Sequence, residues 1–576
     1  MNLKKLQRKL KVIDTNIEAS FKDSCLLLTG EVDNYTKVFK AGKLATKVKS
    51  LGVLNDIKVK GNTPKIRLPE IQDEALEGKE VDVLVIGGGI SGTSILRELS
   101  KYNLKALLVE KDSDLASGQS SRNGGVVHTG LSYPKGSLRL KYCVEGNKMY
   151  KAMCEDLHVP FYNTGQVTFA RRPLEMLALC IAAKGGKKKG IDKLKILNRE
   201  ELLKYEPSVP EWSIGGLYMG TGGITCPHTL TIALAENAVE NGAEVSLDTA
   251  VIDMTVKDHN IVEVLTNRGR IYPKVVINAA GVYADKIAEL AFDRTFTIHP
   301  RSGTYLVTDK KIGHIVNGSM GKTPFTLAPS TIAKLPKKHF AVLKATIKNL
   351  KSPSKGIGLI KTVDDNVLIG PNAKEVIDRE DYATERLVAD TIFEVQQEVQ
   401  PSLKKSDIIA YFTGVRAATY EEEFVVRQGI KTKNIFEVAG IQSPGLTAAP
   451  AIAVDAAKWT VSFLEEQGFK VEENKTFNPK RKYQPILKHL SLEERDKLIK
   501  ENKDYGEIVC RCEEISKGEI IASLNSPIPV YTVDAIKKRV RPGMGRCQGT
   551  FCLSHVMKII ANNSDNKISD AIHKTL

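Results

Sequence analysis

The feature that most constrains the fold is a glycine-rich segment close to residue 87. A mainly apolar run, Val81–Ile86, is interrupted only by Asp82 and reads as a buried strand, and Gly87, Gly89 and Gly92 follow it in G-x-G-x-x-G spacing. The first glycine allows a tight turn, the second lets backbone approach a pyrophosphate, and the third lets a helix pack against the strand. The helix expected to begin near Ile90 directs its N-terminal amides at the phosphates. This spacing predicts a Rossmann-type α/β domain that binds a dinucleotide.

An acidic residue at the end of the next strand supports the same prediction. The apolar run ALLV leads directly into Glu110, which lies 18 residues beyond Gly92. An acid at about this separation binds the ribose hydroxyls of a bound dinucleotide. The glycines therefore occur in the strand–turn–helix–strand context that the fingerprint requires.

The segments that follow resemble the FAD-dependent oxidoreductases of the D-amino-acid oxidase and glycerol-3-phosphate dehydrogenase superfamily. The matching motifs, in order, are SSRNGGVVH, VINAAGVYAD, NVLIGPNA, FTGVRAA and GIQSPGLTAAPAIA, within residues 80–455. The resemblance implies FAD as cofactor and a Rossmann-type FAD-binding domain interleaved with an antiparallel-sheet substrate domain. The cofactor-binding residues that it implies are Gly87, Gly89, Ser91, Gly92, Glu110, Lys111, Ser120, Ser121, Asn123, Val126, Val251, Ala280, Gly281, Gly414, Gly440, Gly445, Leu446 and Thr447.

The last of these motifs has a physical role of its own. Residues 445–447 are expected to open a helix whose N-terminal amides point at the flavin. The positive end of a helix dipole stabilises the negative charge of a reduced flavin.

Two arginines are candidates for holding an anionic substrate. Arg416 in GVRAA matches the arginine that clamps an anionic substrate group in the superfamily, and a guanidinium binds either carboxylate or phosphate in a bidentate fork. Arg301 in HPRSGTYLV is a candidate for a second contact, with an ion pair as the alternative. Tyr305 is expected to line the same wall.

His128 in VVHTG is the candidate catalytic base. Oxidation of a secondary alcohol removes the O–H proton while hydride leaves carbon, and a histidine that titrates near neutral pH suits this task. The alternative is a hydrogen-bonding role near the FAD. His299 and His228 are weaker candidates for the base.

The substrate is expected to be a small anionic alcohol. The stretch VVHTGLSYPKGSLRLKYCVEGN is similar to L-2-hydroxyglutarate oxidases, whereas GIQSPGLTAAPAIA followed by a cysteine domain is similar to bacterial anaerobic-type glycerol-3-phosphate dehydrogenases. We favour oxidation of sn-glycerol 3-phosphate to dihydroxyacetone phosphate. The alternatives are a 2-hydroxy acid dehydrogenase or oxidase, an amine or amino-acid oxidase, and a non-catalytic redox subunit.

Four of the nine cysteines lie close to the C-terminus, as C-x-C and C-x4-C pairs. Four thiolates suit either zinc or an iron–sulfur cluster, and the C-x4-C spacing is wider than the usual zinc pair. The run CRCEE to GMGRCQGTFC resembles the bacterioferritin-associated-ferredoxin-like [2Fe–2S] domain, which implies a cluster that passes electrons to a partner protein. Its ligands would be Cys510, Cys512, Cys547 and Cys552.

The remaining sequence divides into smaller units. Residues 1–61 read as a small αβ module that resembles the BON domain, with an unrelated αβ extension as the alternative. Residues 62–79 contain two prolines and read as a linker. Residues 456–504 are expected to be a helical connector, and 505–576 the cluster domain.

Charge and hydropathy limit the partners. The net charge is +16, but the lysines are dispersed without interleaved aromatic residues, so nucleic acid is not expected. The sequence contains no run of 18 apolar residues, so no membrane span is predicted. Without an export signal or a disulfide-like cysteine array, a cytoplasmic location is the default. The basic charge leaves open peripheral attachment to the inner face of the membrane.

Overall fold

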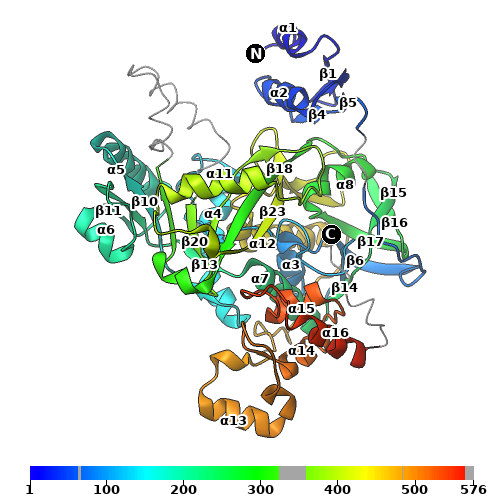
Figure 1. The fold of residues 1–576 in the computed structure, drawn as a ribbon. Coiled ribbons are helices and arrows are strands. Elements are labelled where there is room, and N and C mark those ends of the chain that lie inside the picture. The colour runs from blue at the N-terminus through cyan, green and yellow to red at the C-terminus, as the bar shows by residue number, and fades with distance from the viewer. Residues whose placement is uncertain (63–65, 324–357, 483, 565–576) are drawn as a thin grey trace.

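The computed structural model describes residues 1–62, 66–323, 358–482 and 484–564. Parts of the expected linker, main body, connector and cluster domain, at 63–65, 324–357, 483 and 565–576, lie outside the described residues. The N-terminal module is a small separate unit at one side of the body, and the C-terminal region lies at the opposite side (Figure 1). None of the helices in the described part of the chain is long and apolar enough to span a membrane.

An eight-stranded sheet forms the dinucleotide-binding half of the body. Its centre is parallel, in the order β14-β7-β6-β17-β25, and an antiparallel hairpin extends one edge. The strand and helix expected at Val81–Ile86 and Ile90 are confirmed as β6 and α3. The strands are β6 (Lys79–Ile86), β7 (Ala106–Val109), β14 (Glu244–Ser246), β15 (Val251–Lys257), β16 (Asn260–Thr266), β17 (Gly269–Asn278), β24 (Val425–Gln428) and β25 (Ile435–Ala439).

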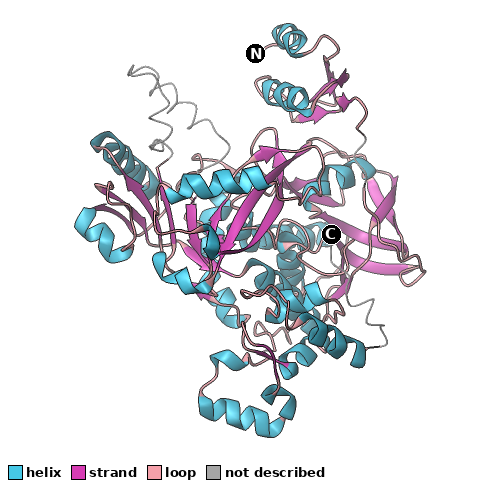
Figure 2. Cartoon of the chain, in the orientation of Figure 1, coloured by secondary structure: helices cyan, strands magenta, loops and turns pink. Residues whose placement is uncertain are grey.

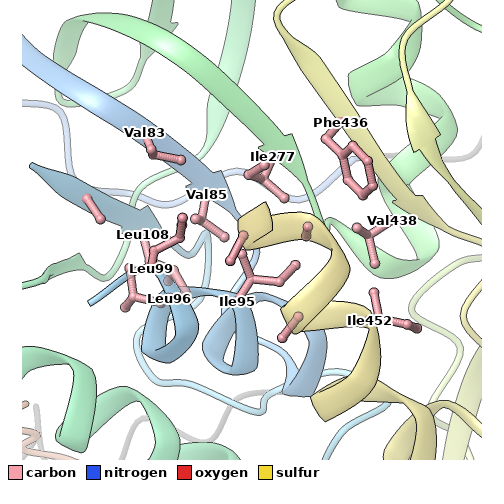
Figure 3. Close-up of a cluster of buried hydrophobic side chains, with 14 of the residues drawn as sticks. Val83, Val85, Ile95, Leu96, Leu99, Leu108, Ile277, Phe436, Val438 and Ile452 are labelled. Atoms are coloured by element: carbon pink, nitrogen blue, oxygen red, sulfur yellow. The ribbon is translucent and has the colours of Figure 1, made fainter. Parts of the chain in front are cut away.

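One face of this sheet packs against helices with many small residues. The helices α3 (Ile90–Leu99) and α12 (Gly445–Glu466) contact each other and the sheet, and α4 (Leu138–Asp156) and α7 (Pro227–Glu240) cover them. Side chains from β6, β7, β17 and β25 meet those of α3 and α12 in a hydrophobic core (Figure 3). Full burial of an Ile or Leu side chain contributes about 1.5–3 kcal/mol, so this core fixes the glycine turn at its edge.

A nine-stranded, mainly antiparallel sheet forms the other half of the body. Its longest pair, β18 with β23, places Arg301 directly across from Arg416. Among the described strands of this sheet, the one parallel pair joins β10 to β19. The strands are β10 (Gln166–Ala170), β11 (Leu194–Asn198), β12 (Gly215–Met219), β18 (Ile298–Thr308), β19 (Ser319–Lys322), β20 (Gly358–Lys361), β21 (Val367–Gly370), β22 (Lys374–Glu375) and β23 (Ile408–Thr419).

Further short elements complete the body. A further sheet has three strands, in the order β8-β13-β9. These elements are β8 (Val126–Val127), β9 (Phe161–Tyr162), β13 (Gly223–Thr225), α5 (Pro173–Lys187), α6 (Arg199–Tyr205), α8 (Ala284–Leu290) and α11 (Arg386–Gln397).

The N-terminal module has its own hydrophobic core, completed by Tyr420 of the body. The expected strand, helix and closing strand are present, and a helix that the sequence reading did not predict, α1, precedes them. The elements are α1 (Leu3–Ile13), β1 (Glu18–Lys22), β2 (Cys25–Thr29), β3 (Glu31–Val32), α2 (Tyr35–Ala45), β4 (Val53–Asn55) and β5 (Lys58–Val59).

The C-terminal region is mostly helical, with one short strand pair (Figure 2). The capping box expected at Ser491 and Glu494 is confirmed at the start of α13. Helix α12 continues to Glu466, past the boundary expected at residue 455. The elements are α13 (Leu492–Glu501), β26 (Ile508–Cys510), β27 (Ile515–Ser516), α14 (Lys517–Leu524), α15 (Val533–Val540) and α16 (Leu553–Asn562).

Candidate active site

A cavity of about 450 Å³ opens at the carboxyl ends of the parallel strands, the edge where α/β sheets bind dinucleotides. It extends from the glycine turn after β6 to Val438 and Ile441 at the end of β25, and to Val415 on β23 of the nine-stranded sheet. This volume lies within the range of small-molecule and cofactor sites. The expected cofactor residues that line it are Gly87, Gly89, Ser91, Glu110, Lys111, Ser120, Val251, Ala280 and Gly281.

The glycine turn has the backbone shape that a phosphate requires. Gly87 adopts φ +111°, and a Cβ there would lie 2.5 Å from the carbonyl oxygen of Ala279. A Cβ on Gly92 would lie 2.0 Å from the carbonyl oxygen of Gly87, so α3 packs directly on the turn. The first turn of α3 holds no acidic side chain. These residues fit a dinucleotide, whose pyrophosphate would lie against the N-terminal amides of α3.

Glu110 is held at the ribose end of the cavity by two backbone hydrogen bonds. Its carboxylate accepts from the amides of Gly88 at 2.6 Å and Asp112 at 2.9 Å. Burial, with a smaller contribution from the charge of Asp112, raises the pKa of Glu110 to about 7. A ribose diol that donates hydrogen bonds to this carboxylate would favour its ionised form.

The other expected cofactor residues surround the cavity without lining it. Gly92 packs α3 onto the turn, Gly414 lies against Arg122, and residues 445–447 open α12 as expected. Within the described residues, those absent from the cavity lining are Gly92, Ser121, Asn123, Val126, Gly414, Gly440, Gly445, Leu446 and Thr447.

The sequence did not predict a set of charged residues that lines the cavity at its ribose end, near Glu110. Ile66, Arg67 and Leu68, from the segment expected to be only a linker, line the cavity together with Glu380 and Tyr382. Arg67 forms ion pairs with Asp112 and, at 3.3 Å, with Glu380. Lys111 also pairs with Glu380. No motif marks these residues, because their contacts join segments about 300 residues apart.

His128 lies where β8 ends and meets the segment leading into α12. Its backbone amide donates to the hydroxyl of Thr447 at 2.9 Å, and its Nε2 lies 3.3 Å from the hydroxyl of Ser443. That hydroxyl is also 3.2 Å from the hydroxyl of Tyr133. His128 therefore has a polar path for a proton on its Nε2 side.

Arg416 is a partly buried arginine whose hydrogen-bond partners, among the described residues, are backbone carbonyl oxygens. Its guanidinium donates to the carbonyl oxygens of Ser302 at 3.2 Å and Asn372 at 3.0 Å and lies across Gly303. Within the described residues, no carboxylate lies within ion-pair distance of it. Burial lowers the pKa of Arg416. A buried cation without a counter-ion favours binding of an anion.

Arg301 is engaged differently from the substrate contact that the sequence reading considered. Its guanidinium is 2.6 Å from Glu375 and 2.6 Å from Glu422, and its side chain is 3% exposed. This geometry corresponds to the ion-pair alternative. His299 is likewise engaged, 2.7 Å from Glu375 and 3.1 Å from the carbonyl oxygen of Thr419.

Tyr305 connects Arg416 with the strand that leads to His128. The Tyr305 hydroxyl lies near enough to Arg416 for the guanidinium charge to act on its pKa. The same hydroxyl hydrogen-bonds to the backbone of Gly124. Tyr305 and Val126 belong to one hydrophobic cluster. Tyr305 therefore lies between the surroundings of Arg416 and strand β8, which ends directly before His128.

The four C-terminal cysteines approach one another as two pairs. The sulfurs of Cys512 and Cys547 are 3.7 Å apart, and the thiols of Cys510 and Cys552 are hydrogen-bonded. Within the described ranges, no group of three or more ligating side chains is arranged around one metal ion. Two thiol pairs fit the four-cysteine requirement of a [2Fe–2S] cluster.

Backbone amides support a thiolate at one of these positions. Burial opposes ionisation of Cys547, but hydrogen bonds from Phe551 and Gly549 lower its pKa. Gly549 has φ +90°, the freedom that such an amide placement uses. Cys510 and Cys552 are buried, whereas Cys512 is exposed.

The cluster region is fixed to the dinucleotide domain by buried charges. Asp114, whose side chain is 3% exposed, pairs with Lys538 at 2.9 Å and Arg539 at 3.1 Å. Lys538 also donates to the hydroxyl of Ser117, a residue that lines the cavity. His228 lies at the same junction, 3.2 Å from the sulfur of Cys226, and burial lowers the pKa of His228 to about 3.

Known proteins give the same picture of the two regions. Residues 82–459 match the family of FAD dependent oxidoreductases, and residues 508–562 match the BFD-like [2Fe-2S] binding domain. The cofactors are therefore FAD and a [2Fe–2S] cluster. Both matched ranges lie beyond residue 80, so neither includes the N-terminal module.

Individual relatives span most of the chain. A glycerol 3-phosphate dehydrogenase of Caloramator mitchellensis is 37% identical over 83% of this chain and 94% of its own length. A glycerol 3-phosphate oxidase of Mycoplasma genitalium is 29% identical over 66% of this chain and 94% of its own length. The FAD-bound L-alpha-glycerophosphate oxidase structure from Mycoplasma pneumoniae aligns with TM-score 0.61 and 27% identity over 71% of this chain and all of its own. With a dinucleotide cavity, a flavoprotein fold and these relatives, the chain belongs to the family of FAD dependent oxidoreductases and carries a C-terminal BFD-like [2Fe–2S] domain.

Proposed function

We propose that this enzyme oxidises the secondary hydroxyl of sn-glycerol 3-phosphate to dihydroxyacetone phosphate and delivers the electrons through its [2Fe–2S] cluster to a partner protein. The observation that carries the proposal is Arg416, a partly buried cation with only carbonyl partners among the described residues. The 37% identical glycerol 3-phosphate dehydrogenase supports this choice of substrate over a 2-hydroxy acid.

Arg416 would bind the phosphate of the substrate. The guanidinium lies across Gly303, where the lack of a side chain leaves room for it, and the carbonyl oxygens of Ser302 and Asn372 fix its plane. A guanidinium held in this way presents its remaining N–H groups to phosphate oxygens as a fork. Arg301 has no such role here, because Glu375 and Glu422 already bind it.

His128 would accept the hydroxyl proton at Nε2. Ser443 and Tyr133 form a hydroxyl chain beside that nitrogen, which orients the imidazole and offers the proton a route away. FAD, when bound, supplies the acceptor for the hydride equivalent that leaves the carbinol carbon. Thr447 accepts from the backbone amide of His128 and so fixes the base relative to the start of α12.

The cluster domain would provide the electron exit. Cys510 and Cys552 are buried against the helices of this domain, whereas Cys512 is exposed. This arrangement leaves one side of the thiol group accessible to a partner protein. The buried Asp114 pairs keep the domain attached to the cavity wall.

The first test is anaerobic flavin reduction followed by stopped-flow absorbance. We expect sn-glycerol 3-phosphate to bleach the flavin of the holoenzyme, with L-2-hydroxyglutarate, lactate and proline much slower. Bleaching by L-2-hydroxyglutarate in preference to glycerol 3-phosphate would refute the substrate assignment. The absence of bleaching by every one of these compounds would refute the dehydrogenase function.

Replacement of Arg416 tests the substrate contact. We expect Arg416→Met to raise KM for glycerol 3-phosphate by about 100-fold, since loss of a buried charge pair costs about 2–5 kcal/mol. Steady-state kinetics with an artificial acceptor measures this change. Arg172→Met, at an exposed arginine before α5, is the control and should leave KM unchanged. An unchanged KM in the Arg416 variant would exclude the residue as the phosphate ligand.

A further inference from the structure

The turn at residues 420–423 lies between the N-terminal module and the residues that support His128. Its outer side contacts the module, and its inner side contacts Arg301, Arg139 and Gln442. No motif of the dinucleotide domain includes it. Its position makes it a connection between the module and the segment that carries Gln442 and Ser443.

On the outer side, one face of α2 packs closely against the turn. A Cβ on Gly42 would lie 2.3 Å from the ring of Tyr420, so only glycine allows this approach. Phe39 lies 5.2 Å from the ring of His299, which stacks on Tyr420 at 4.6 Å. The helix therefore rests on aromatic side chains of the body.

Hydrogen bonds from the module also hold specific atoms of the turn. Lys43 donates to the carbonyl oxygen of Tyr420 at 2.9 Å and to the carboxylate of Glu422 at 3.0 Å. Asn55 of β4 donates to the hydroxyl of Tyr420 at 2.9 Å. The module thus holds the side chain and backbone of Tyr420 and the carboxylate of Glu422.

On the inner side, Glu422 binds the segment that precedes α12. Its carboxylate accepts from Arg301 at 2.6 Å and from the side-chain amide of Gln442 at 2.9 Å. Burial opposes its ionisation, but Arg301 and Lys43 hold the pKa of Glu422 well below its usual range. The carboxylate is therefore an ionised bridge between Lys43 and Gln442.

Arg139 ties the same turn to the neighbour of His128. Its guanidinium donates to the carbonyl oxygen of Glu422 at 2.9 Å and also to the carbonyl oxygen of Ser443. The hydroxyl of Ser443 is the group that lies 3.3 Å from Nε2 of His128. A continuous set of contacts therefore runs from Lys43 through Glu422 and Gln442 to the base.

We propose that the N-terminal module is a positioning element for the catalytic base, with Lys43 as the positioning residue that holds Glu422 and, through it, the Gln442–Ser443 segment. This inference rests on the proposed function in assigning proton removal to His128. Lys43 does not line the cavity. Loss of its ammonium group would loosen the segment beside His128 and leave Arg416 in place.

The test compares three variants of the full-length holoenzyme. We expect Lys43→Met to lower the limiting rate of anaerobic flavin reduction by about tenfold, since small misplacements of a catalytic group have effects of this order or larger. The substrate concentration for half-maximal rate should stay within twofold. Lys43→Arg, which keeps the charge, should restore most of the rate. Lys40→Met is the matched control, because Lys40 is exposed on the same helix and has no described partner.

Equal rates for Lys43→Met and Lys40→Met, with equal flavin content, would overturn the proposal. A rise only in the half-saturating substrate concentration would also overturn it, since that change belongs to substrate binding.

The visible absorption spectrum of the bound flavin separates this inference from the proposed function. Ile441 lines the cavity directly before Gln442, so a loosened segment should shift the flavin spectrum in Lys43→Met but not in Lys40→Met. If glycerol 3-phosphate fails to reduce the wild-type enzyme while this shift is present, the proposed function fails and the positioning role stands. If neither variant shifts the spectrum, the positioning role fails whatever the substrate is.

Discussion

Glu437 on β25 is a buried acid that gives the protein a measurable pH dependence. Its side chain is 1% exposed, Oε2 accepts from Asn278 at 2.7 Å, and Oε1 has no partner within the described residues. Burial raises the pKa of Glu437 to about 8. Below its unfolded-state pKa of 4.5 the group is protonated in both states, so its contribution to stability is fully present there. That contribution is lost as pH rises toward 8, because the folded state must retain a proton that the unfolded chain releases.

We therefore expect Glu437→Gln to stabilise the protein progressively as pH rises. Between pH 5 and pH 8 the difference between variant and wild type should grow by about 3–5 kcal/mol, as linkage requires for a shift of this size. Thermal unfolding at both pH values measures it, with exposed Glu80→Gln as the control. An equal difference at the two pH values would show that Glu437 is ionised in the folded protein.

At the residue scale, the sequence predicted correctly those residues whose identity is required by the local backbone conformation. Gly87 and Gly92 follow from the backbone of the turn, and the structure places both as expected. Arg67 and Glu380 could not be found, because their role depends on long-range contacts. The ion pairs of Arg301 with two carboxylates were left as an alternative for the same reason.

At the scale of elements, α15 of the cluster domain is expected to hold that domain against the body. It contributes Lys538 and Arg539 to the buried pairs with Asp114. We expect Asp114→Asn to destabilise this contact by about 3 kcal/mol, since it leaves two buried cations without their counter-ion. The cluster domain should then become susceptible to limited proteolysis before the body unfolds. Glu244→Gln removes the more exposed pair with Lys79 and is the control. Equal proteolysis of both variants would mean that α15 is held mainly by other contacts.

Elements with a strong local pattern were predicted well, and those without one were not. The strand–turn–helix at β6 and α3 and the capping box of α13 follow from short segments. Helix α1 was missed because its lysine-rich sequence was considered only for its charge and as an export signal, not for its helical periodicity. The boundary expected at residue 455 divides α12, because the helix continues to Glu466 and its second half also contributes to the core that α3 shares.

At the scale of the whole molecule, substrate oxidation and electron delivery should be separable. We expect Cys547→Ser to leave reduction of the flavin by substrate intact and to abolish turnover with the physiological acceptor, because the thiolate set is incomplete. Stopped-flow absorbance measures the first property, and low-temperature EPR of the reduced enzyme measures loss of the cluster signal. Cys180→Ser, on α5, is the matched control. Loss of flavin reduction in Cys547→Ser alone would contradict this division of labour.

The residues around the mouth of the cavity link cofactor binding to the stability of the folded chain. Arg67 and Glu380, 313 residues apart in sequence, meet above a cavity whose floor comes from β6 and β7. A dinucleotide bound there would contact both segments, so the folded state would gain free energy as RT ln(1 + [FAD]/Kd). Flavin supply during synthesis then becomes a determinant of yield: chains made in riboflavin-starved cells would lack this added stability and would be degraded first.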